Sequence, residues 1–590
     1  MTQLLNRRDL DFLLYDVLGA RDLPNAERYQ DYDYESFQSI IDTAARIAEE
    51  QFLPHNQKAD ANEPQFDGTS VVTIPEVKRA WRAFADAGLL AARHDVENGG
   101  MQLPALIHAA CNAWFMAANP STAAYPFLTS AAANLIHAFG SETQKASFLP
   151  AMFSGDFAGT MALTEPDVGS SLGDLTTKAI PIDGQRYNIR GQKMYISGGD
   201  QDITENIVHL VLARIEGAEQ GVKGISLFVV PKFRQNAKGE FAQPNDVTLA
   251  GLLHKMGYRG TTSTVLSFGE HNDCEGTIVG EPGKGLQYMF KMMNEARIGV
   301  GLGAAMIGYR GYLASLDYAR QRPQGRSMSD RDPRSKPVMI IQHTDVKRML
   351  LQQKVWSEGS LALCLYAARL VDAHEAEGDE NSGILVDLLT PIVKSYPSWY
   401  GPKANDLAIQ VLGGAGYTRE YPVEQCYRDN RLNPIHEGTH GIQGLDLLGR
   451  KLWQHNGTGQ KLLLREIQAT LSACQQHPEL SEPLRRYQDV LKPFMDTLLK
   501  LGEAFVGGKA AHVLGNASVF LDVMGKMVVG WLWLRMAERA LATSEDSNFT
   551  AGKLQSAQYF MRWELASVPA ELERMAQLDD TCMQMEEAWF

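Results

Sequence analysis

The chain has 590 residues, of which 44% are hydrophobic and 21% charged, and its formal net charge is −14. This length exceeds what one hydrophobic core can organise, so we expect two to four domains. The balance of 56 Lys and Arg against 70 Asp and Glu argues against a nucleic-acid binder. The six cysteines are widely spaced and form no CxxC pair, which predicts reduced thiols in a cytoplasmic protein rather than a disulfide or metal framework.

The first part of the chain is predicted to be helical. Residues 1–34 form an expected N-terminal arm, with apolar residues from Leu10 to Leu18 at helical spacing. An N-terminal α domain follows over 35–158, broken at Pro54, at Asn98-Gly99-Gly100 and at Asn119-Pro120. The start lacks the apolar core of a signal peptide, and no apolar run of about 18 residues occurs. We therefore expect no integral membrane segment.

The sequence pattern changes between residues 159 and 280, where runs of β-branched and aromatic residues alternate with Gly and Asp. These runs predict a small β domain, a barrel or a sandwich. Helical patterns return over 281–455, expected to be a C-terminal four-helix-bundle domain, and continue over 456–590 as an extra helical domain. Val528–Leu534 within the latter is too short to span a bilayer and is interpreted as part of a buried helix. The predicted fold class is thus α+β and multidomain, with one β domain between helical ones.

Glu437 begins the most informative local pattern, Glu437-Gly438-Thr439. A carboxylate on a Gly-Thr loop can serve as a general base while its neighbouring N–H groups bind an oxygen or a phosphate. Taken alone, the pattern is more typical of a surface loop. Three upstream motifs change this interpretation: Met161–Ser170, with Thr164-Glu165-Pro166; Gly191–Gly199, with Lys193-Met194-Tyr195-Ile196-Ser197; and Met293–Gly299, with Ala296-Arg297-Ile298-Gly299. A fourth, Gln410–Tyr417, precedes Glu437.

In this order the motifs resemble those of the acyl-CoA dehydrogenase flavoprotein family, over about residues 35–455. The arm and the extra helices resemble the large bacterial subgroup that includes 3-methylmercaptopropionyl-CoA dehydrogenase. The resemblance implies FAD-dependent α,β-dehydrogenation of an acyl-CoA thioester to trans-2-enoyl-CoA, in fatty-acid β-oxidation or catabolism of a related thioester such as 3-methylthiopropionyl-CoA. It implies that Glu437 is the base and that its N–H group helps to stabilise the enolate.

The third motif bears on the identity of the base. Some family members carry the base just before the motif's Arg, where this chain has Ala296. Glu295 is rotated by about 100° around the helix and should point elsewhere, which leaves Glu437 as the candidate. Arg297 matches the motif's Arg and is expected near the substrate, although an ordinary surface arginine is the alternative. Gly438 and Ser170 are the further substrate-binding candidates.

The resemblance also implies the FAD contacts. From the β domain it implies backbone groups of Leu163 and Gly169 and the hydroxyls of Thr164 and Ser170, with Tyr195 in place of the family's usual Trp and Ser197 in place of its usual Thr. From the last motifs it implies Gln410, Gly413 and Gly414, acting on the FAD of a neighbouring subunit, and Thr439. Arg322 is a further candidate, but its loop lacks the family's Phe. The extra basic residues Arg326, Arg331, Arg334 and Lys336 either hold CoA phosphates or lie in a solvated loop.

Partners follow from the same resemblance: an electron-transfer flavoprotein as acceptor, and a homodimer because two subunits share the cofactor. Two alternatives remain open. An acyl-CoA oxidase would pass the electrons to O₂. A DNA-associated flavoprotein would need a basic C-terminal domain, but residues 456–590 contain 13 Lys and Arg against 17 Asp and Glu. No metal site is expected.

Overall fold

The computed structural model describes residues 3–329 and 332–590, apart from the side chains of residues 291–294. Its internal contacts divide the chain into two units. Unit 1 comprises Met1–Phe37, Pro104–Ala113 and Arg297–Phe590, and unit 2 comprises Gln38–Leu103 and Trp114–Ala296. The helices α2 (Tyr34–Ile47), α5 (Ala105–Ala118) and α8 (Gly285–Gln321) contain residues of both units.

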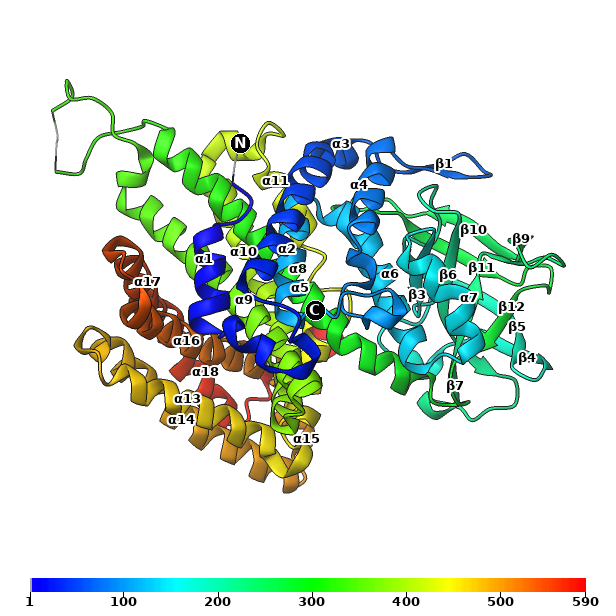
Figure 1. The fold of residues 1–590 in the computed structure, drawn as a ribbon. Coiled ribbons are helices and arrows are strands. Elements are labelled where there is room, and N and C mark those ends of the chain that lie inside the picture. Colours follow the sequence, from blue (N-terminus) through cyan, green and yellow to red (C-terminus); the bar gives the residue numbers. More distant parts are fainter. Residues whose placement is uncertain (1–2, 330–331) are drawn as a thin grey trace. The chain divides into compact units, whose positions relative to one another are not determined.

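Unit 2 begins with helices (Figure 1). They include α3 (Asn56–Ala61), α4 (Pro75–Asp86), α6 (Pro120–Phe139) and α7 (Glu142–Phe153). The predicted break before α6 is confirmed: the Asn119 side chain accepts the Thr122 N–H as an N-cap, and Pro120 occupies the first turn, where no N–H is needed. A ribbon of β1 (Gln65–Phe66) and β2 (Val71–Val72) lies in the region that the sequence predicted to be helical throughout.

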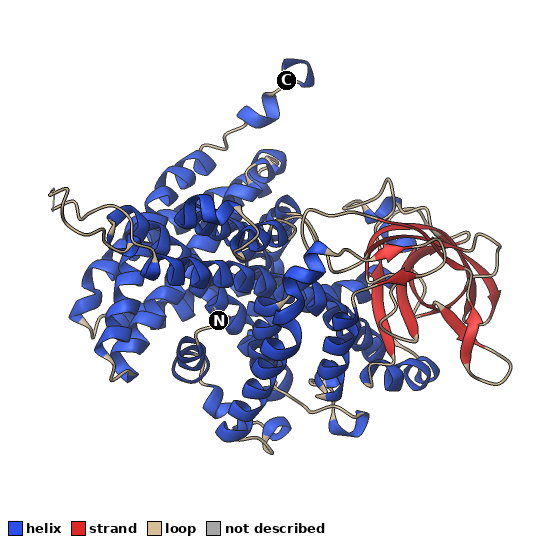
Figure 2. Cartoon of the chain, turned by 90° about the horizontal axis from the view of Figure 1, so that it is seen from above, coloured by secondary structure: helices blue, strands red, loops and turns tan. Residues whose placement is uncertain are grey.

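The strands gather in one β domain, as predicted (Figure 2). They are β3 (Phe157–Ala162), β4 (Lys178–Asp183), β5 (Arg186–Ser197), β6 (Asn206–Ile215), β7 (Ile225–Pro231), β10 (Val247–Leu252), β11 (Ser263–Phe268) and β12 (Glu275–Ile278), with a separate pair of β8 (Phe233–Gln235) and β9 (Phe241–Pro244). Strand β12 links β5 to β7, β7 pairs with β6, and β4 pairs with both β6 and β5. The ring β5-β12-β7-β6-β4 is therefore closed, and the domain is a barrel.

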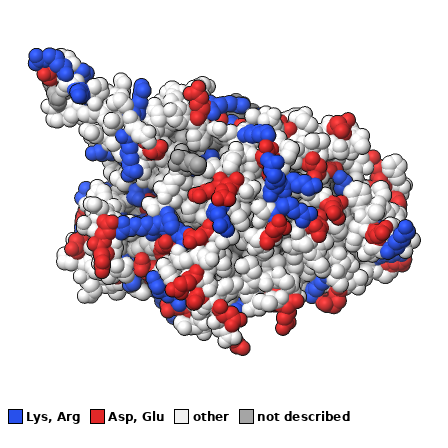
Figure 3. Space-filling model, turned by 45° about the horizontal axis from the view of Figure 1, so that its top comes forward, with Lys and Arg blue, Asp and Glu red and all other residues white. Residues whose placement is uncertain are grey.

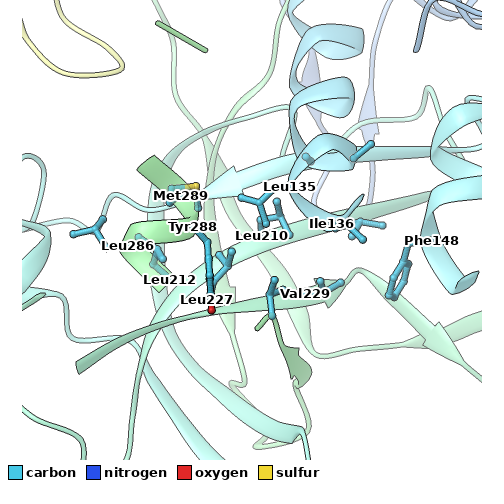
Figure 4. Close-up of a cluster of buried hydrophobic side chains, with 14 of the residues drawn as sticks. Leu135, Ile136, Phe148, Leu210, Leu212, Leu227, Val229, Leu286, Tyr288 and Met289 are labelled. Atoms are coloured by element: carbon cyan, nitrogen blue, oxygen red, sulfur yellow. The ribbon is translucent and has the colours of Figure 1, made fainter. Parts of the chain in front are cut away.

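The outer face of this sheet packs against helices α6 and α7 (Figure 4). Leu135 of α6 and Phe148 of α7 join a cluster with Leu210 and Leu212 of β6. The intervening Val211 belongs instead to a second cluster, with residues of β4, β5, β7 and β11. Both faces of β6 are thus buried, which explains why its sequence is apolar throughout instead of alternating.

Unit 1 is helical in the part of the chain that the structure describes. Its elements include α1 (Arg7–Asp11), α9 (Thr344–Glu377), α10 (Glu380–Leu412), α11 (Val423–Asn430), α12 (His440–Asp446), α13 (Thr458–Cys474), α14 (Ser481–Val506), α15 (Ala510–Gly515), α16 (Ala517–Thr543), α17 (Ser547–Tyr559), α18 (Val568–Ala576) and α19 (Thr581–Gln584). Helices α9 and α10 form a hairpin. Gly378 turns the chain between them in a left-handed conformation, with φ of 71°.

Helix α16 is the central helix of the C-terminal region. It has 27 residues and a mean hydropathy of 1.4 over an 18-residue window, so it meets the length and composition test for a membrane span. The prediction that this segment is too short to span a bilayer was wrong. However, 83% of the window is buried. Trp531 donates to Thr470 Oγ1 of α13 at 2.7 Å, and Trp533 donates to the Val355 carbonyl of α9 at 3.1 Å. The predicted buried helix is confirmed, because its apolar surface packs against other helices of unit 1.

The N-terminal arm is fixed to unit 1 by a buried ion cluster. The apolar residues of the arm, from Leu10 to Leu18, are buried. Lys553 of α17 donates to Asp9 of α1 and, at 2.8 Å, to Glu358 of α9. All three side chains are at most 4% exposed, and Glu358 also pairs with Lys354. Burial raises the pKa of Asp9, so its charge depends on the lysine beside it.

Replacing the lysine of this cluster should destabilise unit 1. Lys553→Met leaves the Asp9 carboxylate buried without its cation, which costs about 3–5 kcal/mol when a buried pair is broken. We expect a lower midpoint of urea unfolding for this variant. The exposed Lys500 offers a matched control, because Lys500→Met should change stability by less than about 0.5 kcal/mol. Equal effects of the two substitutions would contradict a structural role for the cluster.

Candidate functional site

The Glu437 loop lies between α11 and α12 in unit 1. Glu437 has φ of 52° and Gly438 has φ of 88°, so two successive residues are left-handed. A non-glycine residue in this region is strained, and such strain is concentrated at functional sites. A Cβ atom at Gly438 would lie 2.5 Å from Nε2 of Gln443. The backbone conformation therefore favours glycine at this position, and a side chain there would displace the Gln443 amide.

Two buried side chains hold the carbonyl groups of the loop. Gln443 of α12 donates through Nε2 to the Glu437 carbonyl at 3.1 Å. Lys394 of α10 donates through Nζ to the Asn433 carbonyl at 2.8 Å and to the Gly438 carbonyl at 2.7 Å. Among the described residues, no acceptor receives the N–H groups of Glu437 and Gly438. The loop thus has its carbonyls occupied and these two backbone donors free.

The charges around the loop shift one another's pKa values. Burial raises the pKa of Glu437, while Lys394 and Arg297 act in the opposite direction. Burial also lowers the pKa of Lys394, to about 7, although the Glu437 carboxylate opposes this. Arg297 is 4% exposed and donates to Asp446 Oδ2 at 3.0 Å. It is therefore a buried residue of this cluster and not a surface arginine.

A chain of amide side chains anchors the loop to α8. Asn405 donates to the Ile307 carbonyl, and Asn430 donates to the Ala304 carbonyl and to Asn405 Oδ1. Asn433 donates to Asn430 Oδ1, and His436 lies 3.1 Å from Asn433 Oδ1. Backbone carbonyls can only accept, so they set the direction of every hydrogen bond in the chain. His436 is consequently the donor through Nε2, and burial lowers its pKa to about 3, which keeps the ring neutral.

The end of α10 is exposed where the sequence analysis placed FAD contacts. Gln410, Gly413 and Gly414 are exposed, and Gly413 has φ of 60°. A Cβ atom added at either glycine would meet no atom within 4 Å. The backbone here is accessible to a ligand from outside the subunit. Thr439 is also exposed, and its hydroxyl oxygen caps α12 by accepting the Ile442 N–H at 3.3 Å.

Two arginines of the basic loop, which lies between α8 and α9, bind other residues of the same loop. The Arg322 carbonyl accepts the Ile340 N–H, while the Arg322 side chain is exposed. Arg326 donates to the carbonyls of Ser335 and Pro333, and Arg334 pairs with Asp332. Arg331 lies outside the described residues. On the face drawn in Figure 3, basic side chains are interspersed with acidic ones. These contacts favour the solvated-loop interpretation over a phosphate clamp.

In unit 2, a buried ion pair joins the first two motifs. Lys193 of β5 donates to Glu165 Oε1 and to the Leu163 carbonyl, each at 2.9 Å. Glu165 also accepts the N–H and O–H groups of Thr176 and Thr177. Burial alone would raise the pKa of Glu165, but Lys193 and the threonines hold it at about 2. The pair therefore fixes the segment that carries Leu163 and Thr164.

Tyr195 and its neighbours face solvent in unit 2. Tyr195 is 64% exposed and has φ of 61°. The pairing of β5 with β11 shifts register between Ile196 and Lys193, so Tyr195 lies in a β-bulge. Bulges redirect side chains and are frequent beside active sites. Gly169, Ser170 and Ser197 are exposed too, and Thr164 is half-buried.

Glu295 is engaged elsewhere in unit 2. It accepts a hydrogen bond from Asn134 Nδ2 at 3.0 Å and lies 3.8 Å from Arg93. These contacts are consistent with the expectation from helix geometry that Glu295 points elsewhere than the position of Ala296.

Sequence reasoning missed the residues that support these sites: Lys394, Gln443, the amide chain and the Lys193–Glu165 pair. A signal existed for Lys394, because it lies in the run Thr390–Tyr396, where it is the sole charged residue of a largely apolar segment. A lysine in such a run is buried with a partner or a function.

Models of the acyl-CoA dehydrogenase family match most of the chain. The N-terminal domain model matches residues 35–156, the middle domain model 160–270, the C-terminal domain model 283–452 and an acetyl-CoA dehydrogenase C-terminal-like model 463–586. A 3-methylmercaptopropionyl-CoA dehydrogenase of Ruegeria pomeroyi is 33% identical over 98% of both chains. The chain belongs to the acyl-CoA dehydrogenase family. It is therefore an enzyme, and its resemblance to the large subgroup is confirmed.

Other relatives of this acyl-CoA dehydrogenase differ in their named substrates. A butyryl-CoA dehydrogenase of Syntrophomonas wolfei is 33% identical over 100% of this chain and 99% of its own. A broad-specificity linear acyl-CoA dehydrogenase of Mycobacterium tuberculosis is 33% identical over 99% of both chains. Among solved structures, an acyl-CoA dehydrogenase of Bacillus anthracis complexed with FAD has a TM-score of 0.75 and 21% identity, covering 97% of this chain and 93% of its own. The last comparison supports the fold.

The family is FAD-dependent, and the exposed groups of this chain fit that cofactor. Gly413 and Gly414 leave open space beside an accessible backbone, as a diphosphate requires. Tyr195 offers an exposed aromatic face, and the hydroxyls of Ser170 and Ser197 are accessible. In each unit the exposed groups are therefore of kinds that contact a flavin nucleotide: open glycines in unit 1, and an aromatic plane with hydroxyl groups in unit 2.

The Lys193–Glu165 pair predicts a pH-dependent stability difference. Because the folded-state pKa of Glu165 is about 2, below its ordinary value of 4.5, its contribution is present above pH 4.5 and is lost as the pH falls toward 2. We expect Glu165→Gln to be less stable by about 3 kcal/mol at pH 7. Urea unfolding at pH 7 and pH 4 should show this difference shrinking at the lower pH. A difference that grows at low pH would contradict the assignment.

Proposed function

We propose that this acyl-CoA dehydrogenase converts a fatty or related acyl-CoA thioester to its trans-2-enoyl-CoA, with Glu437 as the base. The observation that carries this proposal is the Glu437 loop itself. A half-buried carboxylate with a raised pKa stands beside two unused backbone N–H groups on a strained backbone. A base and an oxyanion-binding donor in the same residue suit the removal of a proton α to a carbonyl.

The α-proton of a thioester is too weakly acidic for an ordinary carboxylate in water. Burial makes the Glu437 carboxylate more basic, which brings its pKa closer to that of the substrate. The Glu437 N–H group stabilises the negative charge that develops on the thioester oxygen, an effect worth on the order of 3–4 kcal/mol per donor. Glu437 then holds the proton on a carboxyl oxygen. Bound FAD supplies the acceptor for the β-hydrogen and its electron pair.

The same proposal assigns the binding residues. Ser170, Arg297 and Gly438 contact the substrate. The proposed FAD-binding residues are Leu163, Thr164, Gly169, Ser170, Tyr195, Ser197, Arg322 and Thr439. Gln410, Gly413 and Gly414 act on the FAD of the partner subunit. Their exposure at the end of α10 supports a role outside their own subunit.

We also propose an electron-transfer flavoprotein as the acceptor, a cytoplasmic location and a role in fatty-acid β-oxidation or in catabolism of a related thioester. The relatives act on 3-methylmercaptopropionyl-CoA, on butyryl-CoA or on a broad range, according to their names. Screening anaerobic flavin reduction against acyl-CoAs of graded length and against 3-methylthiopropionyl-CoA identifies the substrate. Rapid reoxidation of the reduced enzyme by air, with peroxide formed, would indicate an oxidase instead.

Glu437→Gln tests the base. We expect this variant to keep its bound yellow flavin, because the loop contacts are made by backbone groups, and to lose flavin bleaching by acyl-CoA by at least about 1,000-fold. Anaerobic stopped-flow absorbance measures the bleaching rate. The exposed Glu380 provides the matched control, and Glu380→Gln should bleach at the wild-type rate. Bleaching by Glu437→Gln at the wild-type rate would exclude Glu437 as the base.

The shared cofactor predicts that the flavin-loaded protein is a homodimer, with twice the mass of one chain by light scattering. Gly414→Val should keep the fold of each subunit, since a side chain there meets no atom within 4 Å, but should lower the flavin content. Gly552 has the same open surroundings on α17, and Gly552→Val should retain flavin. A flavin-loaded monomer would refute the shared site.

A further inference from the structure

Lys394 is an unusual buried lysine. Its side chain is 0% exposed, and no carboxylate lies within 4.0 Å of its ammonium group among the described residues. Its hydrogen-bond partners are instead the carbonyls of Asn433 and Gly438, five residues apart in the sequence. A buried cation without a contacting anion is costly, so a purely structural role would favour a neutral donor such as Gln.

The two carbonyls bracket the residues between Asn433 and Gly438, and Glu437 is among them. The Lys394 ammonium group therefore joins the two ends of this segment, while Gln443 binds the intervening Glu437 carbonyl. The electrostatic influence is mutual: Glu437 favours the charged form of Lys394, and Lys394 favours the charged form of Glu437. A neutral donor would make the same hydrogen bonds but would lack this second effect.

We infer that Lys394 is a positioning residue for Glu437. It holds the loop through two carbonyls and supplies the positive charge that keeps the carboxylate ionised until it accepts the proton. This inference rests on the proposed role of Glu437 as the base. Once Glu437 is protonated, Lys394 loses its counter-charge, so the pair responds to the transfer as a unit.

Other charged and titratable groups around the loop could also affect the protonation of Glu437. They are Arg297 of α8, Lys403 of α10, His436 of the loop, Asp446 and His440 of α12, and Asp522 of α16. Arg297 pairs with Asp446 at 3.0 Å, and its effect on the pKa of Glu437 is smaller than that of Lys394. Burial lowers the pKa of His436 to about 3 and that of His440 to about 4, so both rings are neutral above pH 5. Removing the charge of Lys394 should therefore change the pKa of Glu437 more than removing that of any of these other groups.

Two variants separate charge from hydrogen bonding. Lys394→Gln keeps a donor without the charge, and Lys394→Met removes both. We expect the acid limb of the pH–rate profile for flavin bleaching to move upward by about one pH unit in both, because Glu437 then protonates more easily. That shift corresponds to about a tenfold loss of rate on the acid limb. Lys394→Met should also lose more thermal stability than Lys394→Gln.

Lys451 supplies the matched control. It is 5% exposed and pairs with Asp387, so Lys451→Met removes a buried lysine without removing charge from the loop. It should lower stability and leave the acid limb in place. An acid limb at the wild-type pH in both flavin-loaded Lys394 variants would overturn the inference.

A measurement without any change at position 394 covers the case in which those variants do not fold. Proton binding by wild type and by Glu437→Gln can be compared by potentiometric titration over the whole pH range in which the folded protein is stable. If the two groups are coupled, Glu437→Gln should lose the carboxyl step and also show an amine step at lower pH. Curves that differ by the carboxyl step alone would overturn the coupling. A failure of the proposed function would be seen in a different experiment: Glu437→Gln would then bleach its flavin at the wild-type rate.

Discussion

The left-handed backbone at Glu437 is the constraint on which the candidate base and its supporting side chains depend. A loop of this shape turns its carbonyls inward, and each buried carbonyl needs a donor. Lys394 and Gln443 supply those donors from two helices, and Asn433 connects the loop to α8 through buried amides. The backbone donors on the other side stay unused. Satisfying one side of the loop therefore prepares the other side to bind an anionic oxygen without rearrangement.

In the β domain, too, a buried lysine binds the backbone of a segment that carries candidate ligand contacts. Glu165 and Lys193 are buried together, and their hydrogen bonds hold two motif segments that are far apart in sequence. The residues beside them, Thr164 and Tyr195, remain accessible. In both units a fully buried lysine, Lys394 or Lys193, binds backbone carbonyls, and residues proposed to meet the ligand are carried on that backbone. Functional groups are held in precise positions only when the residues behind them are fixed by packing and hydrogen bonds.

The sequence predicted the fold well because long periodic segments and ordered motifs carry local information. The β domain, the flanking helices and the burial of α16 follow from that pattern. Conformation at single residues was less accessible: the positive φ at Tyr195 arises from a register shift between strands, and pairing register depends on distant partners. The burial of Lys394 likewise depends on which helices surround α10. Helix length was misjudged for α16 because the segment was assessed by its apolar run alone.

The ion cluster of Asp9, Glu358 and Lys553 has a consequence for how the chain is made. Unit 2 contains no residue beyond Ala296, so all of its residues are available before the second half of the chain is synthesised. Unit 1 instead includes the N-terminal arm, and the partner of Asp9 lies 544 residues further on. The arm, made first, must therefore remain without its buried partner until nearly the whole chain has left the ribosome. Contacts between residues this far apart in sequence form slowly, so the arm cannot complete its native contacts until α17 has been made.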